Sequence, residues 1–251
     1  GFRHYFSSME QANLKYRTGG LELFTNLNYY GGKFYSHENT NMETQGSTTW
    51  LQNIESINRM RNNEFFGKFG LSWMISERHS IGAYYMNGVG LQKPHSDYSS
   101  ISYANGKLDD EVSAVKEGRI HAVPKHHANI YYNGDVGKLG IDFNMDYMWR
   151  KKHENSDQSE TNMNQQKNLV ASTSIGHSRM FAEKFVLSYP LWKGQIEVGN
   201  EYTASQVLND FNINMATIGN SNTKSDEKNM AGFFSIGQQF GKIAVEAGLR
   251  Y

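Results

Sequence analysis

The chain lacks cysteine altogether and has only three prolines among its 251 residues. Without cysteine it can form no disulfide, no thiolate metal site and no cysteine nucleophile. Its 25 basic residues equal its 25 acidic residues in number, so the composition offers no basic surface for nucleic acid. No apolar run reaches the roughly 18 residues that a membrane-spanning helix needs. These absences exclude several function classes and leave the pattern of the remaining residues to indicate the fold.

Aromatic residues are abundant, at 13% of the chain with 15 tyrosines, although the mean hydropathy is −0.67. A chain that is polar on average can still cross a membrane as β-strands, because lipid-facing and lumen-facing residues then alternate. Residues 1–4 are followed by no apolar signal-peptide stretch. We therefore expect that the chain was processed or belongs to a longer protein.

Alternation of apolar and polar residues is the main signal. In residues 139–150, Leu, Ile, Phe, Met, Tyr and Trp occupy every second position, and mostly Gly, Asp and Asn lie between them. Residues 242–251 alternate in the same way, which is typical of a strand with one apolar face. Shorter stretches of the same pattern occur at residues 12–17, 21–29, 67–75, 81–85, 128–133, 184–189 and 196–202. Residues 230–239 are also strand-like, but adjacent Phe233 and Phe234 leave their phase open.

The connections between these strands alternate in length. Short connections rich in turn residues are Gly19-Gly20, 76–79, 134–137, 190–193 and Phe240-Gly241. Long polar stretches, which we interpret as loops, are residues 36–62, 92–119, 153–172 and 209–229. Short periplasmic turns and long extracellular loops are typical of outer-membrane barrels. We therefore predict an all-β fold, an antiparallel transmembrane β-barrel of about ten strands.

Aromatic residues on the apolar faces form two groups. One group, Tyr29, Trp149, Tyr202 and Tyr251, lies about 9 to 11 positions after a short turn. At ~3.3 Å per residue and a strand tilt near ~40°, this separation spans roughly 25 Å, the height of the apolar band of such barrels. The other group, near the short turns, is Tyr16, Trp73, Tyr132 and Tyr189. We predict two aromatic belts at the two membrane interfaces.

A soluble β-sandwich or a lipocalin-like barrel would also show alternating faces. Strands longer than ten residues favour the membrane barrel, since sandwich strands usually have 5 to 6 residues. Histidines suggest a metal site, because His121, His126, His127 and His153 fall in or near the expected loops. Adjacent His126 and His127 point to opposite faces of a strand, so they cannot both bind one ion from a regular ladder. We expect solvated histidines and no metal.

Carboxylates on the polar faces are the remaining candidates for chemistry. We expect Asp142, Asp146, Glu197, Glu201 and Glu246 to pair with Lys15, Arg17, Lys68 and Arg250 across the barrel wall. No serine-hydrolase, phosphate-binding or zinc-protease motif is present, so we expect no enzyme and assign no catalytic, cofactor-binding or metal-binding residue. The aromatic residues of the expected loops either contact a ligand or pack the loops together; they are Trp50, Tyr98, Tyr103 and Phe211.

Two segments resemble a known family. Residues 231–235 (AGFFS) with residues 242–251 (KIAVEAGLRY), and residues 194–202 (GQIEVGNEY), resemble barrel strands of Bacteroidetes-type TonB-dependent outer-membrane receptors. The resemblance implies a barrel of about 22 strands, a plug domain that gates uptake, and energy supplied through TonB. It also implies import of a scarce nutrient such as a metal chelate, a vitamin or a glycan, and a location in the bacterial outer membrane.

Residues 1–251 depart from that pattern, because we recognise in them no plug domain and no TonB-contacting segment. We expect one barrel domain or partial barrel whose partners are outer-membrane lipid, a small nutrient ligand and, through the parent protein, the plug and TonB. The alternative is a complete ten-stranded barrel acting as an enzyme or adhesin. If the barrel is partial, we expect unpaired edges at residues 12–17 and 242–251, so that it closes as a smaller barrel, pairs with another copy or needs detergent.

Overall fold

The computed structural model describes residues 6–215 and 217–251, with the side chains of residues 122–124 left out of the description. Ten strands form one antiparallel sheet whose spatial order is the sequence order, β1 to β10. The bounds are β1 Ser7–Thr18, β2 Leu21–Thr44, β3 Trp50–Ser76, β4 His79–Ala104, β5 Lys107–Val136, β6 Leu139–Thr161, β7 Lys167–Leu191, β8 Gly194–Ile213, β9 Ser221–Phe240 and β10 Ile243–Arg250. Within the described residues, no helix is long and apolar enough to cross a membrane.

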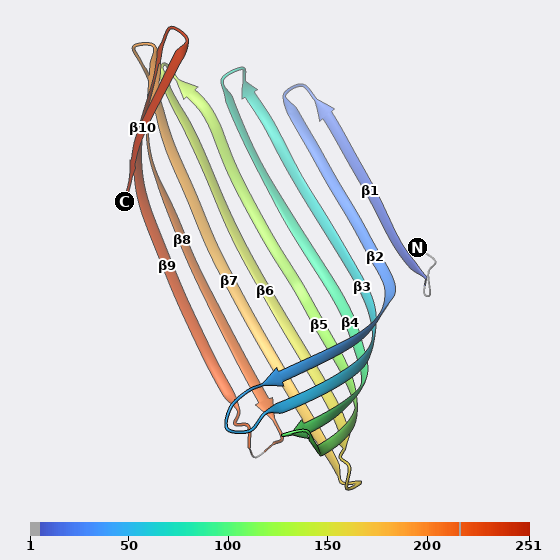
Figure 1. Ribbon diagram of the computed structural model, residues 1–251. Coiled ribbons are helices and arrows are strands. Elements are labelled where there is room, and N and C mark those ends of the chain that lie inside the picture. The colour runs from blue at the N-terminus through green and yellow to red at the C-terminus, as the bar shows by residue number, and fades with distance from the viewer. Residues whose placement is uncertain (1–5, 216) are drawn as a thin grey trace.

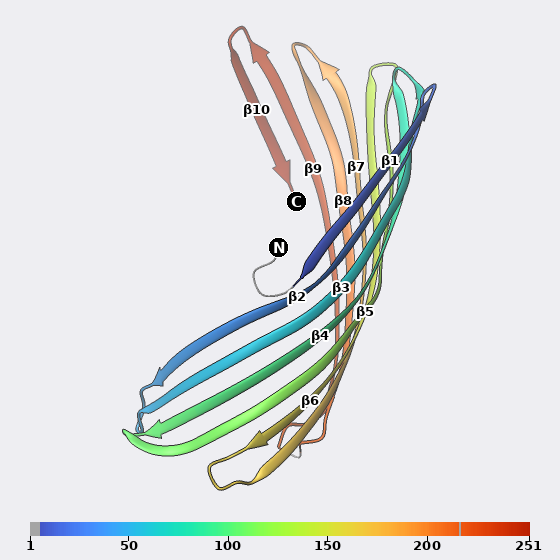
Figure 2. The same cartoon turned by 90° about the vertical axis from the view of Figure 1, so that its right-hand side faces the viewer.

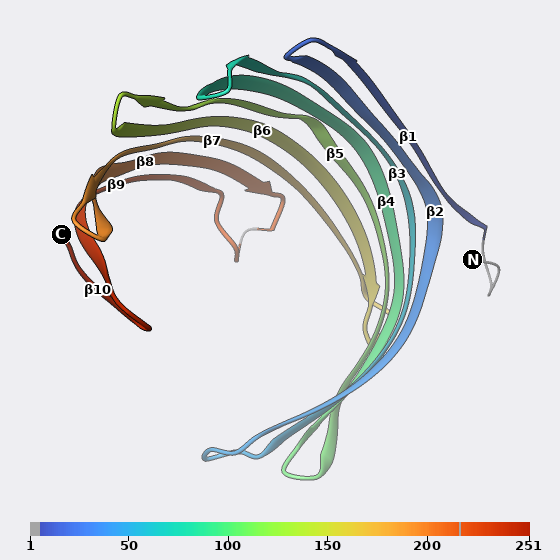
Figure 3. The ribbon, with the colours of Figure 1, turned by 90° about the horizontal axis from the view of Figure 1, so that it is seen from above.

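The sheet is a single curved layer with two open edges. Its strands lie side by side and tilted in Figure 1, and bend along their length in Figure 2. Seen from above in Figure 3, they describe an open arc with β1 at one end and β10 at the other. In the described chain β1 pairs only with β2 and β10 only with β9. The closed ten-stranded barrel kept as an alternative is therefore wrong for this chain, and the predicted edge strands are confirmed.

The apolar residues cover one face of this layer instead of filling a core. Ala114 is the one buried apolar side chain among the described residues, while large apolar side chains such as Phe69, Leu71 and Trp73 are exposed. The register also settles the phase of β9. Phe234 lies opposite Val198 and Leu249 on the apolar face, and Phe233 lies opposite Gly199 and Arg250 on the other face.

Burial shows which face is concave. Apart from glycines, the buried residues all share the polar-phase face; they are Asn62, Ser100, Ala114, Asn129 and Ser156. On a curved sheet, side chains on the concave side converge and cover one another. We therefore name the polar-phase face the inner face and the apolar-phase face the outer face. An exposed apolar outer face of this kind fits contact with hydrocarbon.

The four long polar stretches are strands, and their prediction as loops is wrong. Antiparallel pairing between β2 and β3 continues as far as Thr44 opposite Trp50, and that between β4 and β5 as far as Ala104 opposite Lys107. Among the described residues, only the tips leave the strands, at residues 45–49, 105–106, 162–166, 214–215 and 217–220. Backbone pairing holds such ribbons whatever the polarity of their side chains, because each strand satisfies the N–H and C=O groups of its neighbour.

The predicted short turns all lie at the opposite end of the sheet from these tips (Figure 1). Positive φ angles at Gly19, Gly137 and Gly241 allow tight reversals there, and the turn after β5 is centred on residues 137–138, slightly later than predicted. One irregularity matters for the faces. The register of β5 against β6 shifts by one residue between Val123 and Lys125. In β5, even-numbered residues therefore face outward between Lys125 and the tight turn, and odd-numbered residues face outward from His121 to Glu111.

Candidate functional site

A polar network covers the inner face of β4, β5 and β6 at the level of the apolar outer band. His127 Nε2 lies 2.7 Å from Asp146 Oδ1 and 3.3 Å from the Tyr84 hydroxyl. Asn129 donates to Asp146 Oδ1 at 2.9 Å and to Asn144 Oδ1 at 2.7 Å. The antiparallel register brings these side chains together, since Asn129 lies opposite both Tyr84 and Asp146. The wall is therefore polar and internally hydrogen-bonded where the outer face is most apolar.

The expected carboxylate pairs form only in part. Arg250 pairs with Glu201 at 2.6 Å, as predicted, and Glu201 also pairs with Lys184 at 3.0 Å. Lys15 and Arg17 both pair with Glu22, a carboxylate absent from the predicted set. The amine of Lys68 lies 3.8 Å from the centre of the Tyr84 ring, a cation–π contact in place of the predicted ion pair. The other predicted carboxylates find other partners or none among the described residues: Asp142 accepts from Asn133, Asp146 from Asn129, and Glu197 from Gln195.

Glycines let aromatic rings lie flat against the inner wall. A Cβ atom added at Gly199 would lie 2.5 Å from the Phe233 ring and 2.6 Å from the backbone oxygen of Phe185. At Gly82 an added Cβ would clash with the ring of Tyr131, whose hydroxyl donates to Ser72 at 2.9 Å. The rings therefore cover backbone where a glycine leaves room, and they project less into the space enclosed by the arc.

Toward the outer ends of the strands, the inner face carries further hydrogen-bonding groups. The Tyr98 hydroxyl donates to Glu160 Oε1 at 3.1 Å and accepts from Gln158 Nε2 at 2.5 Å. Burial, with the nearby Glu160 carboxylate, raises the pKa of Tyr98 to about 12. Tyr98 is thus a neutral donor at physiological pH. Buried Asn62 donates to Glu64 at 3.3 Å, and its Oδ1 atom accepts no hydrogen bond from any described residue.

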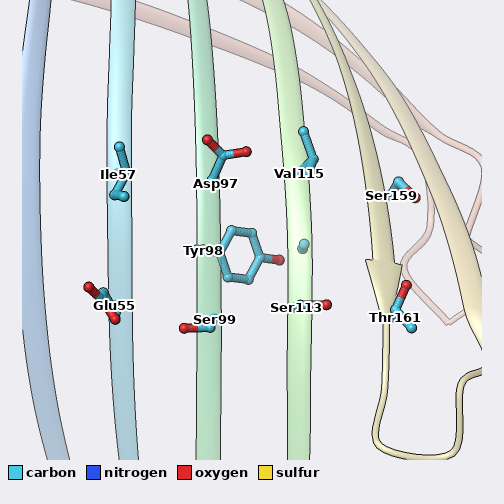
Figure 4. A pocket seen from close by; sticks show the side chains of 10 residues that line it. Glu55, Ile57, Asp97, Tyr98, Ser99, Ser113, Val115, Ser159 and Thr161 are labelled. Carbon is cyan, nitrogen blue, oxygen red and sulfur yellow. The ribbon is translucent and has the colours of Figure 1, made fainter.

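A hollow of 400 Å³ lies at the outer ends of β3 to β6. Figure 4 shows the side chains around it, which are mostly hydroxyls and carboxylates: Glu55, Ile57, Asp97, Tyr98, Ser99, Ser113, Val115, Ser159 and Thr161. Except for Tyr98, these residues share the outer-face phase of their strands. Arg59 donates to Asp97 at 2.5 Å and, as the main cause, lowers the pKa of that carboxyl. The hollow therefore opens on the outside of the arc.

The residues predicted to lie within loops are in strands, so that placement is wrong for His153, Trp50, Tyr98, Tyr103 and Phe211. The prediction that His126 and His127 point to opposite faces of a strand is confirmed. His127 is on the inner face, whereas His126 faces outward and stacks on Trp149 with ring centres 4.9 Å apart. The rings of His121 and His153 are 6.4 Å apart. Over the part of the chain described, no three His, Cys, Asp or Glu side chains are grouped to hold a metal. Trp50, Tyr98 and Phe211 share the inner-face phase and Tyr103 the outer-face phase.

A curved sheet with an apolar outside, a polar inside and two different ends is the geometry of a barrel wall. Residues 133–251, from the end of β5 to the C-terminus, match the model of a family described as the outer membrane protein beta-barrel family. The sheet is the wall of an outer-membrane β-barrel. The fold class and the outer-membrane location predicted from the sequence are thereby confirmed.

Among solved structures, the barrel wall is similar to the ferric preacinetobactin receptor BauA from Acinetobacter baumannii, with a TM-score of 0.38 and 11% identity over 97% of this chain and 46% of that one. It is also similar to the ferric yersiniabactin uptake receptor FyuA from Yersinia pestis, with a TM-score of 0.40 and 11% identity over 97% of this chain and 45% of that one. The chain thus spans under half the length of these receptors. A search of curated proteins finds no match.

Proposed function

We propose that the chain forms part of the barrel of a TonB-dependent receptor that imports a scarce nutrient, such as a metal chelate, a vitamin or a glycan. In this proposal the inner face lines the passage, and its outer ends contribute to ligand binding. The plug domain and TonB act through the rest of the parent protein. The receptor binds and moves its ligand without chemical change, so no residue here is assigned a catalytic role.

The observation that carries the proposal is the continuous polar inner face. Its donors and acceptors run from His127 and Asp146 at the level of the lipid to Tyr98, Gln158 and Glu160 at the outer ends. A polar interior behind an apolar exterior fits a barrel whose inside is in contact with water, plug or ligand.

The open edges add a second argument. Unpaired N–H and C=O groups along β1 and β10 would each cost several kcal/mol in hydrocarbon, so the wall needs further strands from the parent protein or another copy to close. A barrel with more than ten strands grows wider roughly in proportion to its strand number. Such a barrel has room for the plug that the proposal requires.

Transport by the parent protein in its native membrane tests the proposal. Cells that depend on it are given labelled metal chelates, cobalamin-type vitamins and oligosaccharides, with and without a proton uncoupler. We expect one class to accumulate, and accumulation to stop when the uncoupler removes the energy that TonB transmits. Accumulation that persists in uncoupled cells would show passive diffusion and refute the proposal.

A matched pair of variants on β4 then tests the inner face. Tyr98→Ala removes an inner hydroxyl at the outer end, and Tyr103→Ala removes an outward tyrosine five residues away. If Tyr98 contacts the ligand, its loss weakens binding by about fivefold or more, while the Tyr103 variant keeps parental affinity. Equal effects of the two variants on ligand affinity would count against an inner binding face.

A further inference from the structure

A row of cations crosses the outer face above the aromatic residues. Lys33 on β2 lies directly opposite Arg61 on β3, and Arg61 lies opposite Lys93 on β4. The register of β4 against β5 runs without a shift from Gln92–Ile120 to His95–Glu117, which places Arg119 beside Lys93. All four side chains are exposed. We call Lys33, Arg61, Lys93 and Arg119 the cation row.

The position of the cation row relative to the membrane follows from the strands. Tyr29, Phe65 and Val89 form the exposed apolar row nearest to it. The cation row lies four residues farther from the short turns, roughly 13 Å along the strand. Since the short turns mark the periplasmic end, the row lies on the outside of the barrel at the level of the outer-leaflet head groups.

Like charges directly opposite one another destabilise a sheet. One row farther out, Arg59 and His95 pair with Asp97 at 2.5 Å and 3.3 Å, and His95 also pairs with Glu117 at 3.5 Å. Among the described residues, Arg61, Lys93 and Arg119 form no ion pair.

The surface is also hollowed at this place. A groove of 260 Å³ is lined by Lys33, Arg59, Arg61, Lys93 and His95, with Phe34 and Met60. A second hollow of 450 Å³ shares Lys33 and Arg61 and extends toward Tyr29. It passes Gly31, where an added Cβ would lie 2.5 Å from the Tyr29 hydroxyl. The two hollows join a cationic head-group site to the edge of the apolar band.

We propose that the cation row binds the phosphates of a phosphorylated glycolipid of the outer leaflet, with the lipid lying in the groove that descends to Tyr29. Arginine suits this task because its planar guanidinium binds phosphate oxygens in pairs, while lysine contributes a point charge. The partner is a lipid and not a soluble anion, because the groove continues into the membrane-facing surface.

The test uses the whole parent protein, extracted from outer membranes in detergent micelles doped with bis-phosphorylated lipid A. The Arg61→Gln/Lys93→Gln variant is compared with Lys107→Gln/Lys116→Gln, which removes two positive charges from β5 outside the cation row. At ~1 kcal/mol per basic residue near a lipid surface, we expect a roughly 30-fold loss of lipid A affinity in the first variant. The control variant and the charge-conserving Arg61→Lys/Lys93→Arg variant are expected to keep parental affinity.

Two further arms identify the source of the phosphate. Dephosphorylated lipid A is expected to bind as weakly to the parent chain as phosphorylated lipid A binds to the Arg61→Gln/Lys93→Gln variant. Inorganic phosphate at millimolar concentration is expected not to displace lipid A. Parental affinity in the double variant would overturn the proposal, as would displacement by inorganic phosphate, which would assign the row to free anions. Heat-modifiable electrophoretic mobility confirms that each variant keeps its barrel fold.

Discussion

The two halves of each long strand obey different rules. In the half next to the short turns, one face is apolar and exposed and the other is polar, as in Phe69 beside Lys68 on β3. In the outer half both faces are mostly polar, as in Glu55 beside Ser56, yet the same backbone ladder continues. Hydrocarbon dictates the side chains of the first half. Backbone pairing and side-chain hydrogen bonds suffice for the second, so polarity alone is a poor guide to where a barrel strand ends.

The largest expected contrast comes from placing the same charge in the two halves. Phe69→Arg puts a guanidinium at the middle of the apolar outer band, and we expect it to lower the free energy of unfolding by about 2–4 kcal/mol. Ile57→Arg changes the same strand and face in the outer half, and we expect a change within about 0.5 kcal/mol. Urea unfolding in lipid bilayers measures both. Similar losses would show that hydrocarbon does not distinguish the two halves.

A smaller contrast concerns glycines of the inner face. Gly199→Ala, in the half next to the short turns, would press its Cβ against the Phe233 ring and the Phe185 backbone oxygen, and we expect a loss of about 1–3 kcal/mol. Gly176→Ala lies in the outer half, where the nearest atom to an added Cβ is 3.8 Å away. We expect it to be neutral or slightly stabilising, by up to ~1 kcal/mol. Unfolding in bilayers gives both values, and a costly Gly176 variant would contradict the packing difference.

The smallest effect should appear at high pH in the outer half. The ordinary pKa of a tyrosine is about 10, and that of Tyr98 is raised to about 12 in the folded chain. The unfolded chain then releases this proton first, so the stabilisation is complete below pH 10 and is lost as the pH rises toward 12. Tyr98→Phe should remove this loss and cost about 1 kcal/mol at neutral pH through its hydrogen bonds. Hydrogen exchange of β4 across this pH range compares the two chains; identical pH dependence would contradict the assignment.

The sequence predicted the half next to the short turns well. Alternation over residues 139–149 and 243–251 reflects burial of every second side chain in lipid, a strong and local constraint, and the structure places both sets on one face. The sequence alone could not assign Phe233 and Phe234 to the inner or the outer face, because either of two adjacent aromatic residues could lie on the apolar face. Their assignment needed the partner strand, with Leu249 opposite Phe234.

The outer half was predicted as loops because asparagine, serine and charged residues are weak strand formers. One local signal did point to a hairpin there. Asn105-Gly106 has positive φ at both residues, 50° and 78°, between strands that pair at Ala104 and Lys107, and such a dipeptide is a strong mark of a two-residue hairpin. The polar network around His127 could not be predicted from the sequence either, since it depends on which residues of three neighbouring strands lie opposite one another.

The extra residue in β5 between Val123 and Lys125 has an effect well beyond its own position. Because side chains alternate with a period of two, the residues from His121 to Asp110 are turned over relative to an unbroken ladder; a second shift next to Leu108 then restores the original phase. Deleting that single residue would carry Arg119 and His121 into the watery interior and bring Lys116 and Gly118 round to the lipid side. In an alignment, a relative with one residue fewer in this strand would therefore present a different set of charged side chains to the membrane.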